Sequence, residues 1–196
     1  MERTDNPVLD HMRDYKDRTG NMPQHLPEIW VGCLHCYNDG RLVGDWFPAI
    51  DGEDLTPEDI HGQPVDSRHE ELWVFDHQYI PERNEFQPPH GTRWGEIYEE
   101  VGDDQWPAFM AWIAAGAHTT DADNMPVVSD FEEQYKGEYI SWEEYADQLA
   151  DDIGLLDEMP EHLLGYFDWD AWRDDVKMDY TVVHNDDGNY FIFSDI

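Results

Sequence analysis

Carboxylates are the side chains of this sequence best placed to do chemistry, and near residue 150 they form a regular pattern. Glu143, Asp147 and Asp151 stand four residues apart on a predicted helix, and Glu144 and Asp152 lie in the neighbouring column. Residues four apart rise about 6 Å along a helix, so these carboxylates form a line. Surface helices usually alternate Glu with Lys at this spacing, whereas like charges cost ~0.2–0.5 kcal/mol per pair. The pattern therefore indicates a functional anionic surface.

The acidic pattern continues beyond this helix without basic partners. No Lys or Arg occurs between Lys136 and Arg173, and Asp170 and Asp174 repeat the four-residue spacing on a second predicted helix. A solvated face is the ordinary interpretation of such a charge run. We favour a partner-binding surface because the acids lie on helices with caps and aromatic cores. The carboxylates predicted to bind the partner are Glu132, Glu133, Glu138, Glu143, Glu144, Asp147, Asp151, Asp152, Asp157, Glu158, Glu161, Asp168, Asp170, Asp174 and Asp175.

Two cysteines, Cys33 and Cys36, have the spacing of half a zinc site, but a structural site needs four ligands. In an extended strand, positions 33 and 36 point to opposite faces. The sequence has no second paired motif, and its ten His are scattered without a His-x-x-x-His pair. We therefore predict no metal ligands and no cofactor.

Other catalytic patterns are missing from the sequence. It has neither a Gly-rich phosphate loop nor a Gly-x-Ser-x-Gly element. Residues 185–188 do not complete an EF-hand calcium loop and fit a hairpin turn better. A carboxylate pair for acid–base catalysis cannot be chosen among 46 Asp and Glu without geometry. The sequence therefore predicts a protein that is not an enzyme and has no catalytic residues.

The elements that must position the carboxylates indicate an α+β fold with hairpins at both ends. The predicted strands cover 29–34, 42–47, 72–75, 180–183 and 190–193. The Asp-Gly pair within 38–40 favours a turn, because the turn needs positive φ. Proline-rich 81–89 should break regular structure.

Helices are predicted between the two groups of strands. They cover 92–101, 105–115, 141–154 and a last helix that Asp168 can cap. Ser141 to Glu144 have the pattern of a capping box, in which the Ser hydroxyl and the Glu carboxylate each accept a backbone N–H of the other residue. Gly154 should end this helix. Its predicted apolar stripe is Trp142, Tyr145, Ala146, Leu149 and Ile153, and that of the last helix is Trp169, Trp172 and Val176.

The chain as a whole is strongly acidic. Its 196 residues include 46 Asp and Glu against 11 Lys and Arg, a net charge of −35. Nine Trp, ten Tyr and eight Phe supply the cores that disordered acidic tails lack. B-DNA carries one charge per ~1.7 Å, so 35 charges equal those of about 60 Å of duplex, and the carboxylates could stand in for phosphates. Such acidity argues against direct binding to nucleic acid or membranes and favours a basic partner.

Composition also bears on the location of the protein in the cell and on its N-terminal segment. No run approaches the ~20 apolar residues of a membrane span, and the first five residues contain no apolar signal segment, so we predict a cytoplasmic protein. Residues 1–26 have a net charge of −1, whereas the other 170 residues carry 41 acids and 7 bases. Gly20, Pro23 and Pro27 close this segment, which we predict to be a flexible extension.

Two long motifs resemble the ArdA family of antirestriction proteins. Ile29-Trp30-Val31-Gly32 with Tyr37-Asn38-Asp39-Gly40-Arg41-Leu42-Val43-Gly44-Asp45-Trp46-Phe47 is similar to the family's first hairpin, Tyr-Asn-x-Gly-x-Leu-x-Gly-x-Trp. Residues 154–174 are similar to its C-terminal signature. The motifs occur in the family's order, and the resemblance extends over nearly all of 28–196. Residues 1–26 lie outside the family pattern, and Cys33 and Cys36 are not family cysteines.

The resemblance implies an elongated α+β chain of three small domains, with a β-hairpin or three-stranded sheet at each end and helices between. The expected division is an extension at 1–26, an N-terminal α+β domain at 27–86, a central helical domain at 87–124 and a dimerising C-terminal α+β domain at 125–196. The apolar stretch Met125 to Val128 is the candidate dimer contact.

The resemblance also implies a function. ArdA proteins are homodimeric mimics of bent B-form DNA that block type I restriction–modification enzymes, and mobile elements typically encode them. The expected partners are therefore the DNA-binding groove of the specificity and methyltransferase core and a second copy of the chain. Two alternatives remain from the residues alone: a halophile's acidic binding or scaffold protein without DNA mimicry, and an acidic metal-binding enzyme.

Overall fold

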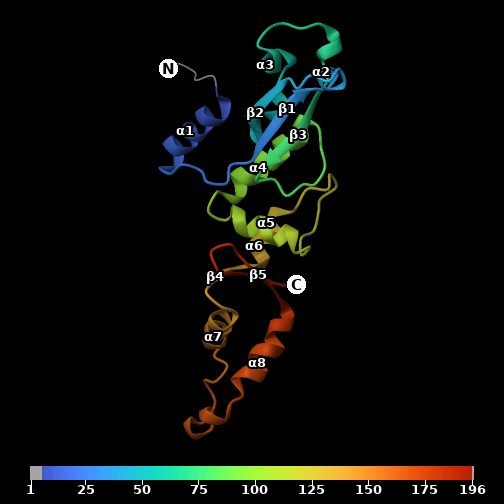
Figure 1. The fold of residues 1–196 in the computed structure, drawn as a ribbon. Helices are drawn as coiled ribbons and strands as arrows, with labels where there is room; N and C mark the ends of the chain where they lie inside the picture. The colour runs from blue at the N-terminus through green and yellow to red at the C-terminus, as the bar shows by residue number, and fades with distance from the viewer. Residues whose placement is uncertain (1–5, 196) are drawn as a thin grey trace. The chain divides into compact units, whose positions relative to one another are not determined.

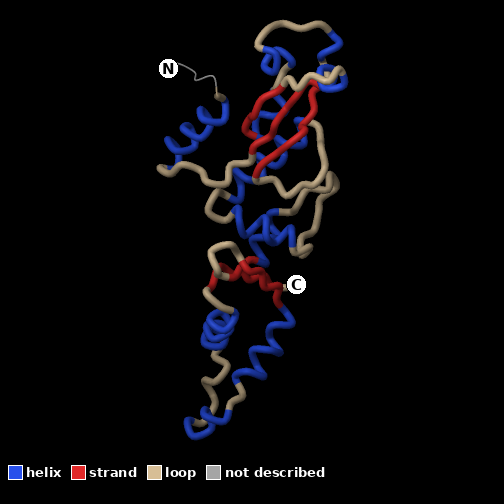
Figure 2. Tube along the Cα trace, viewed as in Figure 1, coloured by secondary structure: helices blue, strands red, loops and turns tan. Residues whose placement is uncertain are grey.

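The computed structural model describes residues 6–195 and has a mixed α+β fold (Figure 1). Two three-stranded antiparallel sheets, β2-β1-β3 and β4-β6-β5, are separated along the chain by helices (Figure 2). The predicted α+β class and the position of the sheets along the chain are confirmed. The chain divides into two compact units, one ending at Met110 and the other beginning at Ala111. Among the helices of residues 6–195, none has the length and apolarity needed to cross a membrane.

The first unit is built around β1, the central strand of its sheet. Ile29 and Val31 on this strand are fully buried, and Ile29 pairs with Phe47 of β2 and His77 of β3. The elements of this part of the chain are α1 (Pro7–Thr19), β1 (Glu28–Cys33), α2 (Leu34–Asn38), β2 (Gly44–Pro48), η1 (Ala49–Asp54), α3 (Pro57–His61), η2 (Ser67–His69), β3 (Leu72–Gln78) and α4 (Pro88–Val101). Helix α5 (Trp106–Ala114) contains the boundary between the two units.

The first hairpin is confirmed, but a short helix connects its strands instead of a tight turn. Strand β1 ends at Cys33, one residue earlier than predicted, and α2 follows at once. The helical turn buries Cys36, and the Cys36 carbonyl accepts the N–H of Arg41 at 2.9 Å. Gly40 has the expected positive φ of 75°. The extended geometry predicted beyond Cys33 was therefore wrong, because burying Cys36 requires the chain to coil.

Helix α4 begins at Pro88, inside the segment predicted to break regular structure. Proline is accepted at the first helical position because that N–H has no intrahelical partner. Trp94, Ile97 and Tyr98 form the buried side of the helix. Gly95 lies directly against η1, so that a Cβ at this position would stand 2.5 Å from the backbone N of Ile50.

Replacing Gly95 by Ala should destabilise the first unit, although the same change stabilises an open helix by about 1 kcal/mol. The added methyl would overlap the backbone of Ile50, which cannot rotate away. We expect a loss of about 1–3 kcal/mol in the free energy of unfolding, measured by urea titration. Gly165→Ala is the control, because a Cβ there meets no atom within 4 Å and φ is not positive. Equal stability of the two variants would contradict the close α4–η1 contact.

The second unit contains the second sheet and the helices packed on it. Its elements are α6 (Val128–Gln134), β4 (Tyr135–Tyr139), α7 (Trp142–Asp152), η3 (Glu161–Tyr166), α8 (Trp169–Val176), η4 (Lys177–Asp179), β5 (Tyr180–His184) and β6 (Tyr190–Ser194). Trp142, Tyr145 and Ala146 of α7 pack against Ile192 of β6 to form the core. Trp172 of α8 covers this cluster. The C-terminal hairpin and both predicted helices are confirmed, whereas α6 and β4 were not predicted.

Two details of α7 differ from the prediction. Ser141 caps the helix by accepting the N–H of Glu144 at 3.1 Å, but the Glu144 carboxylate accepts the N–H of Ile140 at 2.9 Å and not that of Ser141. Ile153 was placed on the apolar stripe, yet it is 59% exposed. The helix ends at Asp152 and Gly154 has a positive φ of 63°, so the chain turns before Ile153 reaches the core.

Candidate functional site

All of the carboxylates predicted to bind a partner lie in the second unit, and every one of them is exposed. From Ala111 to the end of the sequence, 22 Asp and Glu stand against three Lys and Arg. The fifteen are spread over consecutive elements: α6 and β4 (Glu132, Glu133, Glu138), α7 (Glu143, Glu144, Asp147, Asp151, Asp152), the η3 region (Asp157, Glu158, Glu161), and α8 with its cap (Asp168, Asp170, Asp174, Asp175).

Helix α7 carries the densest group. Its buried residues occupy one side, while Glu143, Asp147 and Asp151 form one exposed column and Glu144 and Asp152 belong to the next. Nine residue steps separate the first carboxylate from the last, which is about 13.5 Å of helix axis. Five charges over this length give one per ~2.7 Å, between the ~1.7 Å of a DNA duplex and the ~3.4 Å of one of its strands.

Arg173 of α8 changes the charge of this surface. Its Nε and Nη2 donate to Oδ1 of Asp147 at 2.9 and 2.6 Å, and its Nη1 lies 3.4 Å from Oδ1 of Asp170. The expectation that the acids lack basic partners was therefore wrong for these two carboxylates. Asp170 lies three residues before Arg173 on α8. Asp147 lies on a different helix, 26 residues from Arg173, and only the packing of α8 beside α7 brings these two charges together.

The remaining carboxylates of α7 keep their charge exposed. Glu143 accepts hydrogen bonds from its own backbone N–H and from the Ser141 hydroxyl, which lower the pKa of Glu143 and hold it ionised. Asp151 and Asp152 lie at the C-terminal end of α7, where the helix dipole is negative. Acidic residues at that end oppose the dipole, an effect of about 0.3–1 kcal/mol each. Stability therefore does not explain why these two residues are acidic.

Three of the predicted carboxylates also hold the local structure. Glu144 accepts the N–H of Ile140 as described, and Asp168 caps α8 by accepting the N–H of Ala171 at 3.0 Å. Glu138 accepts the side-chain amides of two Asn in the β5–β6 turn at 2.6 and 2.9 Å. These residues can contribute charge, but their substitution would also disturb the fold.

The candidate dimer contact at Met125 to Val128 is not supported. Met125 is 1% exposed and Val128 is 6% exposed, so neither side chain is available to a second chain. Apolar side chains that are exposed occur elsewhere in the second unit: Ile140, Ile153, Leu163, Leu164, Tyr166 and Met178.

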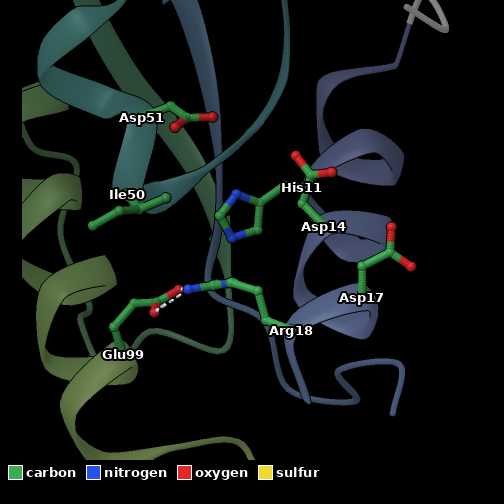
Figure 3. Close-up of a pocket in the computed structure, with 7 residues that line it drawn as sticks. All are labelled: His11, Asp14, Asp17, Arg18, Ile50, Asp51 and Glu99. Atoms are coloured by element: carbon green, nitrogen blue, oxygen red, sulfur yellow. Dashed lines mark hydrogen bonds and ion pairs between the residues drawn. The ribbon is translucent and has the colours of Figure 1, made fainter. Parts of the chain in front are cut away.

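A second acidic group surrounds a hollow beside α1 in the first unit (Figure 3). The hollow is lined by His11, Asp14, Asp17, Arg18, Ile50, Asp51 and Glu99. Both Nη atoms of Arg18 donate to Glu99, at 3.1 and 2.9 Å, and this pairing lowers the pKa of Glu99. Burial raises the pKa of Asp51. The ion pair between Arg18 and Glu99 attaches α1 to the rest of the first unit.

Helix α1 lies within the extension predicted at 1–26. Asn6 caps it by accepting the N–H of Leu9 at 2.9 Å, and Gly20 ends it with a φ of 87°. Val8 and Leu26 are buried. Residues 1–5 of the extension lie outside the described residues, and the flexibility of the whole segment stays a prediction.

The structure brings together four side chains, two cysteines and two histidines, which no sequence motif connects. Sγ of Cys33 and Sγ of Cys36 lie 3.3 and 3.5 Å from Nδ1 of His69, and His61 belongs to the same group. The expectation that the two cysteines point to opposite faces was wrong, because Cys33 ends a strand and Cys36 lies on a helix. The missing second pair is His61 and His69, whose spacing of eight residues resembles no short motif.

Comparison with known proteins identifies a matching family. The family model described as Antirestriction protein (ArdA) matches residues 29–191, which begin in β1 and end in β6. The match therefore includes residues of both sheets and all the predicted partner-binding carboxylates. No curated protein matches the chain.

Proposed function

The chain belongs to the ArdA family of antirestriction proteins, and from this premise we propose that it inhibits type I restriction–modification enzymes by occupying their DNA-binding groove. Members of this family are inhibitors and not enzymes, in agreement with the prediction that the chain is not an enzyme. The observation that carries the proposal is the exposed carboxylate surface of α7, whose charge spacing is close to that of DNA.

The proposed inhibition involves no chemical step. Groove Lys and Arg that normally neutralise phosphates would neutralise carboxylates of the second unit, and the bound inhibitor would exclude DNA by occupying the same site. Helices present the carboxylates on a fixed frame, so less side-chain and backbone entropy is lost on binding than a disordered acidic tail would lose. The acidic residues at the C-terminal end of α7 destabilise the isolated helix, because they oppose its dipole. Their presence there is in agreement with selection for negative charge and not for stability.

We include the homodimer in the proposal. Pairing two chains would lengthen the anionic surface, as a mimic of a long stretch of DNA requires. The exposed apolar side chains of the second unit are candidates for the contact, because monomeric proteins rarely leave large apolar patches open. Light scattering of the purified chain measures this state directly.

The test is binding of the purified chain to a type I methyltransferase core across a salt series. A complex that neutralises about six groove charges should lose affinity by the order of 10³-fold between 50 and 200 mM salt. Direct binding must be measured, because salt also weakens the competing DNA. At one low salt concentration, the chain should displace a labelled DNA duplex from the enzyme.

Two results would overturn the proposal. One is an affinity that does not change with salt, and the other is a ternary complex in which the enzyme holds the chain and DNA together. A merely solvated acidic surface, the alternative interpretation, gives no displacement of DNA and instead leads to unfolding when salt is removed.

A further inference from the structure

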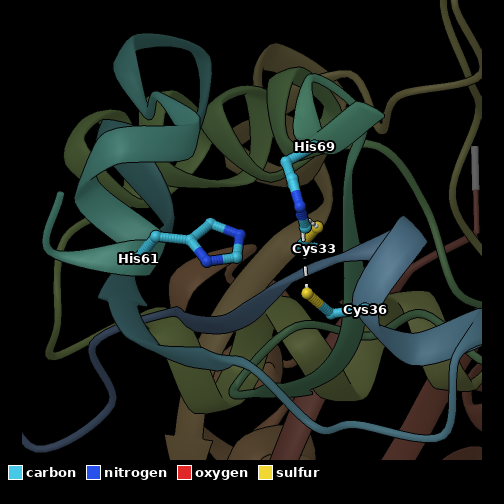
Figure 4. Close-up of side chains that lie close together, drawn as sticks. All are labelled: Cys33, Cys36, His61 and His69. Carbon is cyan, nitrogen blue, oxygen red and sulfur yellow. Dashed lines mark hydrogen bonds between the residues drawn. The ribbon is translucent and has the colours of Figure 1, made fainter. Parts of the chain in front are cut away.

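Four side chains able to bind a metal converge at one end of the first sheet (Figure 4). Cys33 is the last residue of β1, Cys36 lies on α2, His61 ends α3 and His69 ends η2. One ligand atom from each lies within 4.8 Å of the others. Both cysteines are 1% exposed and free, and both histidines are half-buried.

We propose that Cys33, Cys36, His61 and His69 bind one zinc ion in tetrahedral geometry. Zinc binds thiolate sulfur at ~2.3 Å and imidazole nitrogen at ~2.0–2.1 Å, so a sulfur and a nitrogen on one tetrahedron lie about 3.6 Å apart. The Sγ atoms of Cys33 and Cys36 are 3.3 and 3.5 Å from Nδ1 of His69. The side chains therefore already have nearly the spacing that a shared ion imposes.

The donor set and its surroundings favour zinc. Two thiolates and two imidazoles in tetrahedral arrangement are typical of zinc, whereas the carboxylates that dominate this chain suit magnesium or calcium. Nε2 of His61 is buried and has no hydrogen-bond partner among residues 6–195. A buried ring nitrogen without a partner is costly, and a metal or the reorientation of the ring toward one removes that cost.

The role of such an ion is structural. Four protein ligands fill a tetrahedral site and leave no position open for a substrate. The ion would join α2, α3 and η2, which have five, five and three residues, to the end of β1. Helices this short are not stable alone, because nucleation is unfavourable and few hydrogen bonds follow it. Zinc would thus hold the long connection between β2 and β3 on the first sheet.

The first measurement is the metal content of the intact chain purified under reducing conditions without chelator. We expect one zinc per chain by elemental analysis. The acidic surface could retain metal ions nonspecifically, so cobalt(II) is the second probe. Cobalt at this site should show the intense visible bands of a tetrahedral ion and a thiolate charge-transfer band in the near ultraviolet, neither of which carboxylates produce.

Substitutions separate the ligands from their neighbours. Cys36→Ser and His61→Gln should each abolish the thiolate-cobalt spectrum or weaken cobalt binding at least about 100-fold. His35→Gln is the matched control: the His35 ring centroid lies 4.8 Å from that of His69, but His35 is outside the ligand group. It should keep the wild-type spectrum and stoichiometry.

The proposal is overturned if the reduced, folded wild-type chain, identified by circular dichroism, takes up cobalt without the thiolate band. A Cys33–Cys36 disulfide that persists under reducing conditions would overturn it as well. Because the wild-type spectrum is decisive by itself, a variant that fails to fold does not remove the test. Antirestriction activity does not enter the readout, so the outcome is independent of the proposed function.

Discussion

Replacing Asp151 and Asp152 by Asn should weaken binding to a type I enzyme about 30-fold while leaving the chain as stable as before or more stable. Both side chains are exposed at the C-terminal end of α7, and removing two contacts with groove cations at roughly 1 kcal/mol each gives the expected loss. Removing negative charge from the negative end of a helix adds stability. The two effects have opposite signs, so a damaged fold cannot imitate the result.

The matched control is Asp14→Asn with Asp17→Asn. These two residues are also exposed on a helix, and they lie outside the residues that match the family model. The double change removes the same net charge, so binding should change less than about threefold if position matters more than total charge. Equal losses for both pairs would show that bulk acidity, and not the α7 surface, makes the contact.

Asp147→Asn should weaken binding less than either change at the end of α7. The Asp147 carboxylate already pairs with Arg173 at 2.6 Å, so less of its charge is available to a partner. The single variants Asp147→Asn and Asp151→Asn, compared in the same binding assay, rank the two positions. A larger loss for Asp147 would mean that Arg173 exchanges partners when the enzyme binds.

Alkaline pH should destabilise both units. Burial raises the pKa of Tyr98 in the first unit and of Tyr145 in the second, and their side chains are 1% and 7% exposed. A phenol whose pKa is higher in the folded than in the unfolded chain adds stability that is complete below pH ~10 and is lost as pH rises further. The slope for each tyrosine rises from about half of ~1.4 kcal/mol per pH unit at pH 10 to the full value above it. The free energy of unfolding of each compact unit should therefore fall by about 2 kcal/mol between pH 10 and 12.

Urea unfolding from pH 8 to 12, followed with tyrosinate absorbance, measures this loss. Tyr145→Phe should flatten the alkaline decline of the second unit, because the ionisable hydroxyl is gone. Tyr166→Phe is the control, since Tyr166 is 85% exposed and its ionisation costs the fold little. An unfolding free energy that stays constant up to pH 12 would be incompatible with buried tyrosine hydroxyls.

Local patterns along the sequence determined many of the secondary-structure elements of this protein. Short apolar and aromatic runs separated by turn residues predicted the hairpins at both ends. The cap at Ser141 with its apolar stripe predicted α7 and the exposure of its carboxylates. These features depend on interactions between residues at most a few positions apart, which a linear sequence displays. Helices α2 and α3 were not predicted, because five residues contain too little periodicity and tertiary contacts stabilise them.

The sequence determined which residues form the site, whereas the tertiary structure decided which of their charges are neutralised. Spacing alone placed the carboxylates on one face of α7, but the packing of α8 decided that Arg173 neutralises Asp147. In the same way, Cys33 and Cys36 are only three residues apart in sequence, whereas His61 and His69 reach them only through the fold. Coulombic and coordination contacts depend on distance in space, and that distance is set by how the elements pack.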